Sequence, residues 1–159
     1  MAYQIDETDR QLLRLLQENA RYTAIELAER IGVSDNTIHN RMDRLEDAGI
    51  ITGYKATVDP GKANLDLFFH FICTTRISNR ADVAEQVMTY PEVLEVTELM
   101  TGQENLHIKM VGSTDQDITN MAERLDDLPL EINDETLIRT NHTKPLDFTN
   151  LPNTHHKDS

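Results

Sequence analysis

VSDNTIHNRMDRLEDAGIITGYK, residues 33 to 55, is the stretch of sequence that decides the fold of this chain. Ser34 is a residue type that caps helix N-termini, and Gly49 is a type that ends helices. The apolar residues between them recur at helical spacing and predict one inward face: Ile38, Met42 and Leu45. Two short β-type runs then flank Thr52-Gly53, a pattern typical of a hairpin. The stretch therefore predicts a helix followed by a hairpin wing over residues 50–58.

Two further helices are predicted upstream of this stretch. Residues 5–20 carry a broad apolar stripe at helical spacing: Ile5, Leu12, Leu13, Leu15 and Leu16. The next predicted helix starts at Thr23, with Glu26 at capping-box spacing, and ends at Gly32, which suits a tight turn. Three helices and a hairpin predict a winged helix-turn-helix over residues 1–58.

The pattern changes after residues 59–64, DPGKAN, which are predicted to form a linker. Residues 65–144 then alternate between strand and helix patterns in the order βαββαβ. That order is typical of a ferredoxin-like sheet with two helices on one face. The predicted fold class is therefore α+β, a winged helix-turn-helix followed by a ferredoxin-like βαββαβ domain. Residues 145–159 are predicted to form a flexible tail.

The first predicted strand of the sheet is apolar on both faces: Phe68, Phe69, Phe71, Ile72 and Cys73. A sheet with helices on one side only should be polar on its other side. Apolar residues on both faces indicate that the second face is covered, most simply by the same sheet of a partner subunit. The strand therefore predicts a homodimer.

The composition indicates a globular, acidic protein of the cytoplasm. The formal net charge is −13, and the chain has one cysteine, Cys73, which suits a reducing compartment. No run is long and apolar enough to predict a membrane span, and the N-terminus is not a secretory signal. Many Asp and only five Lys are typical of proteins that work in concentrated salt, such as those of halophilic archaea.

The first half of the chain resembles the Lrp/AsnC (feast/famine) family of transcriptional regulators. The matching positions are Ile5, Asp6, Asp9, Asn19, Ala20, Arg21, Leu27, Ala28, Arg44, Leu45, Gly49, Ile50, Ile51 and Tyr54. The resemblance covers residues 5–142 and rests on topology in the second half. It implies a protein that binds double-stranded promoter DNA. The sequence has no nucleophile–base pattern, Gly-rich phosphate loop or clustered metal motif, so we expect neither catalytic activity nor a cofactor. It also implies a dimer or a larger ring, such as an octamer, tuned by an amino acid or another small effector.

The predicted recognition helix supplies the candidate DNA contacts. Its outward positions near the N-terminus are Asp35, Asn36, Thr37, His39 and Asn40. Asn can bind adenine edges, and His can donate to guanine or to phosphate. Further phosphate contacts are predicted from Arg41, Arg44 and Lys55, and from the helix N-termini at Thr23 and Ser34. The alternative for Arg41 and Arg44 is ion pairing within the helix, with Asp43, Glu46 or Asp47.

The turn between the two central strands is the candidate effector site, together with one residue of the last strand: Met100, Thr101, Gly102, Gln103, Glu104, Asn105 and Thr136. Main-chain N–H groups at Gly102 could hold a carboxylate. The family that the chain resembles has Asp where Asn105 stands, so a ligand's ammonium group would lack its ionic partner. An ordinary amino acid is therefore a poorer candidate than another small molecule.

Three histidines are weak metal candidates: His70, His107 and His142, assigned to the first, third and fourth predicted strands. A metal needs about three convergent ligands, and packed histidines are the simpler interpretation. The three histidines also leave open the alternative that the protein is an enzyme like the siroheme decarboxylases, which share this two-domain plan. A third alternative is an effector-sensing module with vestigial DNA binding, which acidic Asp35 and Asp43 on the groove face would suit.

Overall fold

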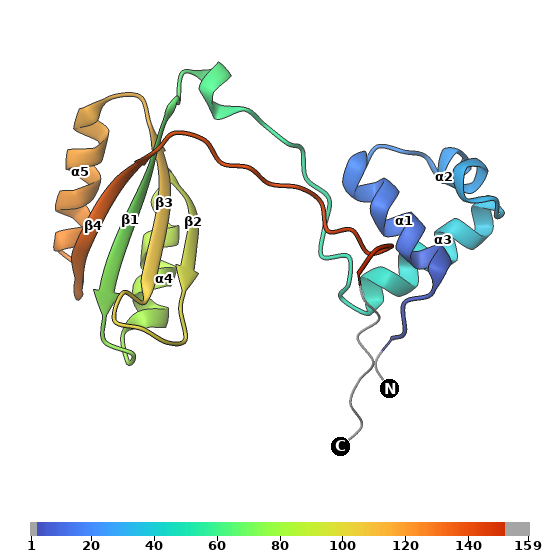
Figure 1. Cartoon of the computed structure of the whole chain (residues 1–159), viewed down its shortest axis with the longest axis horizontal. Coiled ribbons are helices and arrows are strands. Elements are labelled where there is room, and N and C mark those ends of the chain that lie inside the picture. The colour runs from blue at the N-terminus through green and yellow to red at the C-terminus, as the bar shows by residue number, and fades with distance from the viewer. Residues whose placement is uncertain (1–2, 152–159) are drawn as a thin grey trace. The chain divides into compact units, whose positions relative to one another are not determined.

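The computed structural model describes residues 3–151, which divide into two compact units (Figure 1). The first unit comprises residues 3–57 and 142–151, and the second comprises residues 58–141. Each unit has its own buried apolar core. The sheet-bearing unit is therefore inserted, in sequence, between two parts of the helical unit. None of the helices in residues 3–151 is long and apolar enough to cross a membrane.

The first unit contains helices α1 (Glu7–Glu18), α2 (Ala24–Ile31) and α3 (Asp35–Asp47). Their apolar stripes meet in one core, and its members are fully buried or nearly so: Leu12, Leu13, Leu15, Leu16, Leu27, Ala28, Ile38 and Leu45. Gly32 ends α2 with a φ of 85°, a left-handed conformation that glycine adopts without strain. This turn lets α3 follow α2 within three residues, as the sequence predicts.

The predicted hairpin wing is absent from the described structure. Residues 52–58 are extended but belong to no strand in the described part of the chain. The N–H groups of Ile50 and Ile51 both bind the carbonyl of Leu45, at 2.9 and 3.1 Å, and Tyr54 donates to Glu46. The segment is thus attached to α3 by its own hydrogen bonds.

The second unit starts with a short 3₁₀ turn, η1 (Pro60–Ala63), and contains a four-stranded antiparallel sheet. Its elements are β1 (Leu67–Thr75), α4 (Arg80–Met88), β2 (Val93–Glu98), β3 (Leu106–Gly112), α5 (Asp115–Asp126) and β4 (Leu130–Ile138). The strand order is β2-β3-β1-β4. This is the predicted ferredoxin-like arrangement, with the first and third strands in the middle of the sheet.

The two faces of β1 differ in burial. Phe69, Phe71 and Cys73 are buried in the core with residues of α4 and α5. The alternating residues Phe68 and Ile72 point to the opposite face and are partly exposed. Partly exposed apolar side chains in a central strand agree with the predicted two-sided character of this strand.

Part of the predicted flexible tail, residues 146–148, contacts α1. The Gln17 side-chain amide donates to the Leu146 carbonyl and accepts from the Leu146 N–H, both at 3.0 Å. Arg10 donates to the Phe148 carbonyl at 2.7 Å, and the Phe148 ring packs against the first core. Sequence patterns missed this contact because its partners are about 130 residues apart. Residues 152–159 of the predicted tail lie outside the described residues.

Candidate nucleic-acid interface

The N-terminus of α3 presents the polar residues that the sequence singles out. Ser34 caps the helix by accepting from the Thr37 N–H at 3.1 Å, and the two hydroxyls lie 2.8 Å apart. Both hydroxyls therefore have partners within the helix. Four neighbouring side chains are exposed: Asp35, Asn36, His39 and Asn40. Asn36 and Asn40 are four residues apart and so share one helix face.

Arg41, predicted to contact phosphate, is instead bound to α1. Its guanidinium donates to both carboxylate oxygens of Asp6, at 2.6 and 2.7 Å, and to Asp9 at 2.9 Å. The Asp9 side chain is only 1% exposed and also accepts from the Tyr3 hydroxyl and the Asp6 N–H. The ion pair within α3 that was the alternative for Arg41 does not form either. A buried carboxylate needs compensation, so Arg41 holds α3 against α1.

The titration of this cluster follows from its geometry. Partial burial would raise the pKa of Asp6, but hydrogen bonds from Arg41 and from the Asp9 N–H, with the Arg41 charge, lower it overall. The Arg41 pKa is raised, chiefly by its hydrogen bonds to Asp6 and Asp9. The Asp6 carboxylate and the Arg41 guanidinium are therefore both ionised at neutral pH.

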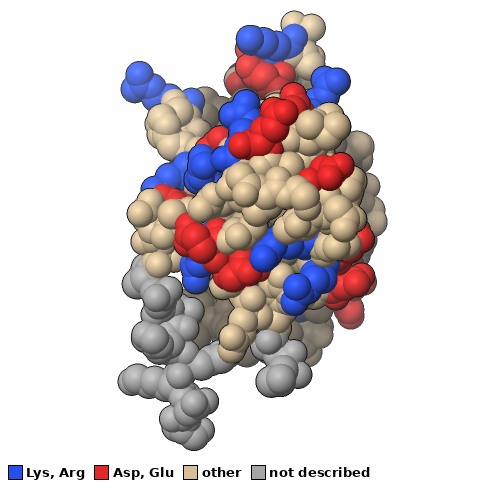
Figure 2. Space-filling view, turned by 90° about the vertical axis from the view of Figure 1, so that its right-hand side faces the viewer, with Lys and Arg blue, Asp and Glu red and all other residues tan. Residues whose placement is uncertain are grey.

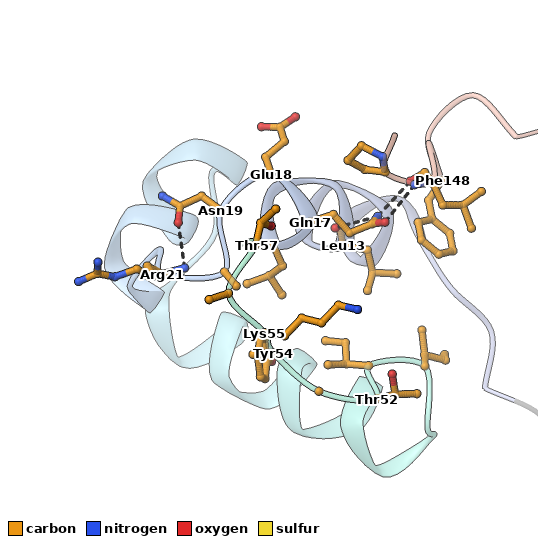
Figure 3. A pocket seen from close by; sticks show the side chains of 18 residues that line it. Leu13, Gln17, Glu18, Asn19, Arg21, Thr52, Tyr54, Lys55, Thr57 and Phe148 are labelled. Carbon is orange, nitrogen blue, oxygen red and sulfur yellow. Dashed lines mark hydrogen bonds between the residues drawn. The ribbon is translucent and has the colours of Figure 1, made fainter. Parts of the chain in front are cut away.

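The remaining predicted phosphate contacts have different surroundings. The Arg44 guanidinium lies 5.1 Å from the centre of the Tyr3 ring and has no ion pair within residues 3–151, so it remains available to an anion. Thr23 caps α2, but Glu26 accepts from both its N–H and its hydroxyl, at 2.8 and 3.0 Å. A carboxylate of the protein itself thus occupies this helix N-terminus. Lys55 points into a cavity beside α1, and no α3 residue lines that cavity (Figure 3).

The surface of this unit carries interleaved charges. Figure 2 shows basic and acidic side chains side by side rather than one continuous basic patch. Residues 1–60 hold 7 basic and 11 acidic side chains, and the rest of the chain holds 8 and 17. Residues 1–60, which include all three helices of this unit, are therefore less acidic than the rest of the chain.

The candidate effector turn between β2 and β3 has one structural residue. Asn105 is only 5% exposed, and its amide accepts from the Thr75 N–H at 3.0 Å and donates to the Thr75 carbonyl at 2.8 Å. Asn105 therefore ties the turn to the end of β1 and is not free to bind a ligand. The other turn residues, 100–104, are exposed, with Met100 at 91%.

Thr136 does not join this turn within one chain. Thr136 pairs with His70 of β1, whereas the turn is attached to β1 at Thr75. These two positions on β1 are five residues apart. At about 3.3 Å per residue the two places are roughly 16 Å apart along the strand. The sequence could not reveal this separation because it depends on the strand register.

The histidines form a pair rather than a triad. The rings of His70 and His107 lie 5.0 Å apart, edge to face, and the buried Nε2 of His70 has no hydrogen-bond partner in the described structure. His142 is not on the last strand, because β4 ends at Ile138. Cys73 lies on the helix side of the sheet, where burial raises its pKa to about 12. Residues 3–151 contain no group of three potential metal ligands.

Comparisons with known proteins agree with this architecture. Residues 5–52 match the family described as winged helix-turn-helix DNA-binding. The chain is 35% identical over 113 residues to the regulatory protein AsnC of Escherichia coli K12, covering 69% of this chain and 72% of AsnC. It is 24% identical to the HTH-type transcriptional regulator FL11 of Pyrococcus horikoshii, covering 81% and 85%.

A solved structure extends the likeness over both units. The complex of transcriptional regulator NMB0573 with L-Met, from Neisseria meningitidis, has a TM-score of 0.78 at 28% identity, covering 90% of this chain and 96% of that chain. The fold therefore agrees with that of a solved relative over most of its length, and the chain belongs to the Lrp/AsnC family of helix-turn-helix transcriptional regulators.

Proposed function

We propose that this regulator reads its operator with Asn36, His39 and Asn40. These side chains are exposed at the start of α3 and have no hydrogen-bond partner within residues 3–151. The Asn amides can each donate to and accept from adenine, and His39 can donate to guanine. Arg44 and the main chain near Ser34 supply phosphate contacts. Arg41 does not contact DNA in this proposal; it holds α3 against α1 and so positions the residues that do.

The single observation that carries this proposal is that Arg41 is bound within the protein whereas its neighbours on α3 are exposed. Asn36, His39 and Asn40 are exposed, whereas Arg41 is bound by two aspartates. Gel shifts on DNA from upstream of the protein's own gene test it. We expect N36A/N40A to weaken specific binding about ten- to hundredfold. N120A, at an exposed position of α5, is the matched control. Unchanged binding by the double variant would refute the assignment.

The active unit in this proposal is a homodimer that uses the open face of the sheet. Phe68, Ile72 and the His70–His107 pair are partly exposed there, in the middle of the sheet. The same sheet of a second subunit, packed on this face, would bury these side chains and remove their apolar surface from water. Larger rings of dimers are an extension of the same proposal. Analytical ultracentrifugation of F68E tests whether this face forms the dimer interface, with T119E at an exposed position of α5 as the control. The dimer should dissociate only in F68E.

The effector and the working environment complete the proposal. A small molecule binds at residues 100–104, where backbone groups around Gly102 are exposed, and not through Asn105. The protein works in the cytoplasm of a cell with concentrated internal salt, which the net charge of −13 and the interleaved surface of Figure 2 support.

It acts by binding rather than by catalysis. A Soret shift on mixing with siroheme would favour the decarboxylase alternative, for which the His70–His107 pair is the one supporting feature.

A further inference from the structure

A cavity of about 660 Å³ lies in the first unit, and none of the α3 residues proposed to contact DNA lines it (Figure 3). Its walls are the C-terminal half of α1 with the following loop, residues 50–57, and part of the C-terminal segment 145–148. No residue of α3 lines it, and neither does any residue of the turn between β2 and β3. Its volume falls in the range of small-molecule sites.

One part of the cavity lining is apolar and firmly held. The apolar lining residues are Leu13, Leu16, Ile50, Ile51, Leu146 and Phe148. The two-point contact between the Gln17 amide and Leu146 fixes the C-terminal wall, and Arg10 holds the Phe148 carbonyl. This wall therefore does not depend on apolar packing alone, so the cavity is a formed feature of the unit.

The rest of the lining includes main-chain groups without hydrogen-bond partners in the described structure and the positively charged side chain of Lys55. Figure 3 shows the Lys55 side chain directed into the cavity, and Lys55 has no ion pair within residues 3–151. The main chain of residues 52–57 also has no hydrogen-bond partner there. By contrast, the acidic residue Glu18 is bound to Arg14 at 2.8 Å, and the Tyr54 hydroxyl donates to Glu46.

We propose that this cavity binds an amphipathic monocarboxylate. The carboxylate pairs with the Lys55 ammonium group and accepts from main-chain N–H groups of residues 52–57, and the apolar part of the ligand lies against Leu16, Ile51 and Phe148. Glu18 is already paired, so no free carboxylate lines the cavity to receive an ammonium group. The site therefore favours carboxylates over amino acids of the same shape. It is independent of the proposed operator contacts and of the proposed effector turn.

Calorimetric titration of the full chain with 4-methylpentanoate tests this assignment, since that probe is leucine without its ammonium group. We expect 4-methylpentanoate to bind and leucine to bind at least about tenfold more weakly. K55M should weaken binding by about ten- to hundredfold, the effect of losing a charge-assisted hydrogen bond. K62M removes the same charge in the other unit and should leave binding unchanged.

A second variant separates the cavity from the charge. Ala56 is an exposed lining residue, and A56W should block the cavity and abolish binding while circular dichroism shows a folded chain. Equal binding of leucine, full binding by K55M or A56W, or no binding at millimolar probe would each overturn the proposal. None of these measurements uses DNA, so the outcome does not depend on whether the operator contacts are correct.

Discussion

The Arg41 guanidinium of α3 lies 2.9 Å from the Asp9 carboxylate of α1, and that carboxylate is 1% exposed. Removing one member of a buried ion pair leaves the other uncompensated, at a cost of about 3–5 kcal/mol. The Arg41 side chain is 21% exposed, so we expect R41M to lower the free energy of unfolding by about 2–3 kcal/mol. Urea unfolding measures this change.

The double variant R41M/D9N should recover most of that loss, because it removes both charges together. R14M, which breaks the exposed pair with Glu18, is the matched control and should cost less than about 1 kcal/mol. If R41M is no more damaging than R14M, the role assigned to Arg41 in fixing α3 is wrong.

A pH effect is expected from His70. Burial, followed by the charges of His107 and Lys109, lowers its pKa below the usual 6.5, against the opposing charges of Glu95 and Asp134. The unfolded chain then binds a proton more readily than the folded chain as the pH falls below about 6.5. Stability of the sheet unit should therefore decrease from pH 7 towards the lowered pKa and level off below it. Thermal unfolding of H70Q should lose this slope, whereas exposed H39Q should keep it.

Asn105 provides a direct test of its structural role. N105D introduces the acid that the family typically has, but the new carboxylate cannot donate to the Thr75 carbonyl and would be buried. We expect a loss of about 2–4 kcal/mol at pH 7, from a lost hydrogen bond and an uncompensated charge. The loss should shrink in acid, where the carboxyl is protonated. E104Q, on an exposed neighbour, should be neutral; equal stability of N105D and the parent at pH 7 would contradict the assignment.

The C-terminal segment should contribute measurably to the helical unit. F148A removes a partly buried ring from the first core, which we expect to cost about 1–3 kcal/mol. L151A changes a more exposed residue three positions away and should have little effect. Hydrogen exchange of α1 amides should rise in F148A only; similar exchange in both variants would mean that the segment does not stabilise this unit.

The salt dependence of DNA binding should differ from that of an ordinary regulator. Most DNA-binding proteins lose affinity steeply with salt because bound phosphates release counterions. Here acidic groups lie among the basic ones (Figure 2), and they should take up cations as DNA approaches. We expect a shallow or reversed dependence in a fluorescence-anisotropy titration from low to molar KCl. A steep conventional loss would contradict it.

The sequence predicts local structure well where caps and periodicity agree. Ser34, Thr23 and Gly32 mark the helix ends that the structure has, and the strand order follows from the βαββαβ pattern. Two failures are local: the hairpin predicted around Thr52-Gly53 does not form in the described structure, and β4 ends before His142. The other failures are long-range. The partner of Arg41 lies on another helix, and the anchor of the C-terminal segment is Gln17. The separation of Thr136 from the turn depends on register. Each of these depends on tertiary geometry that no local pattern contains.

The contact between Gln17 and Leu146 has a consequence for the order of synthesis. Residues that complete the helical unit leave the ribosome only after all of residues 58–141. The sheet can thus fold during translation while the helices still lack Phe148, since domains fold as they emerge. A nascent chain therefore acquires its complete DNA-binding part last, when the whole sheet has already emerged.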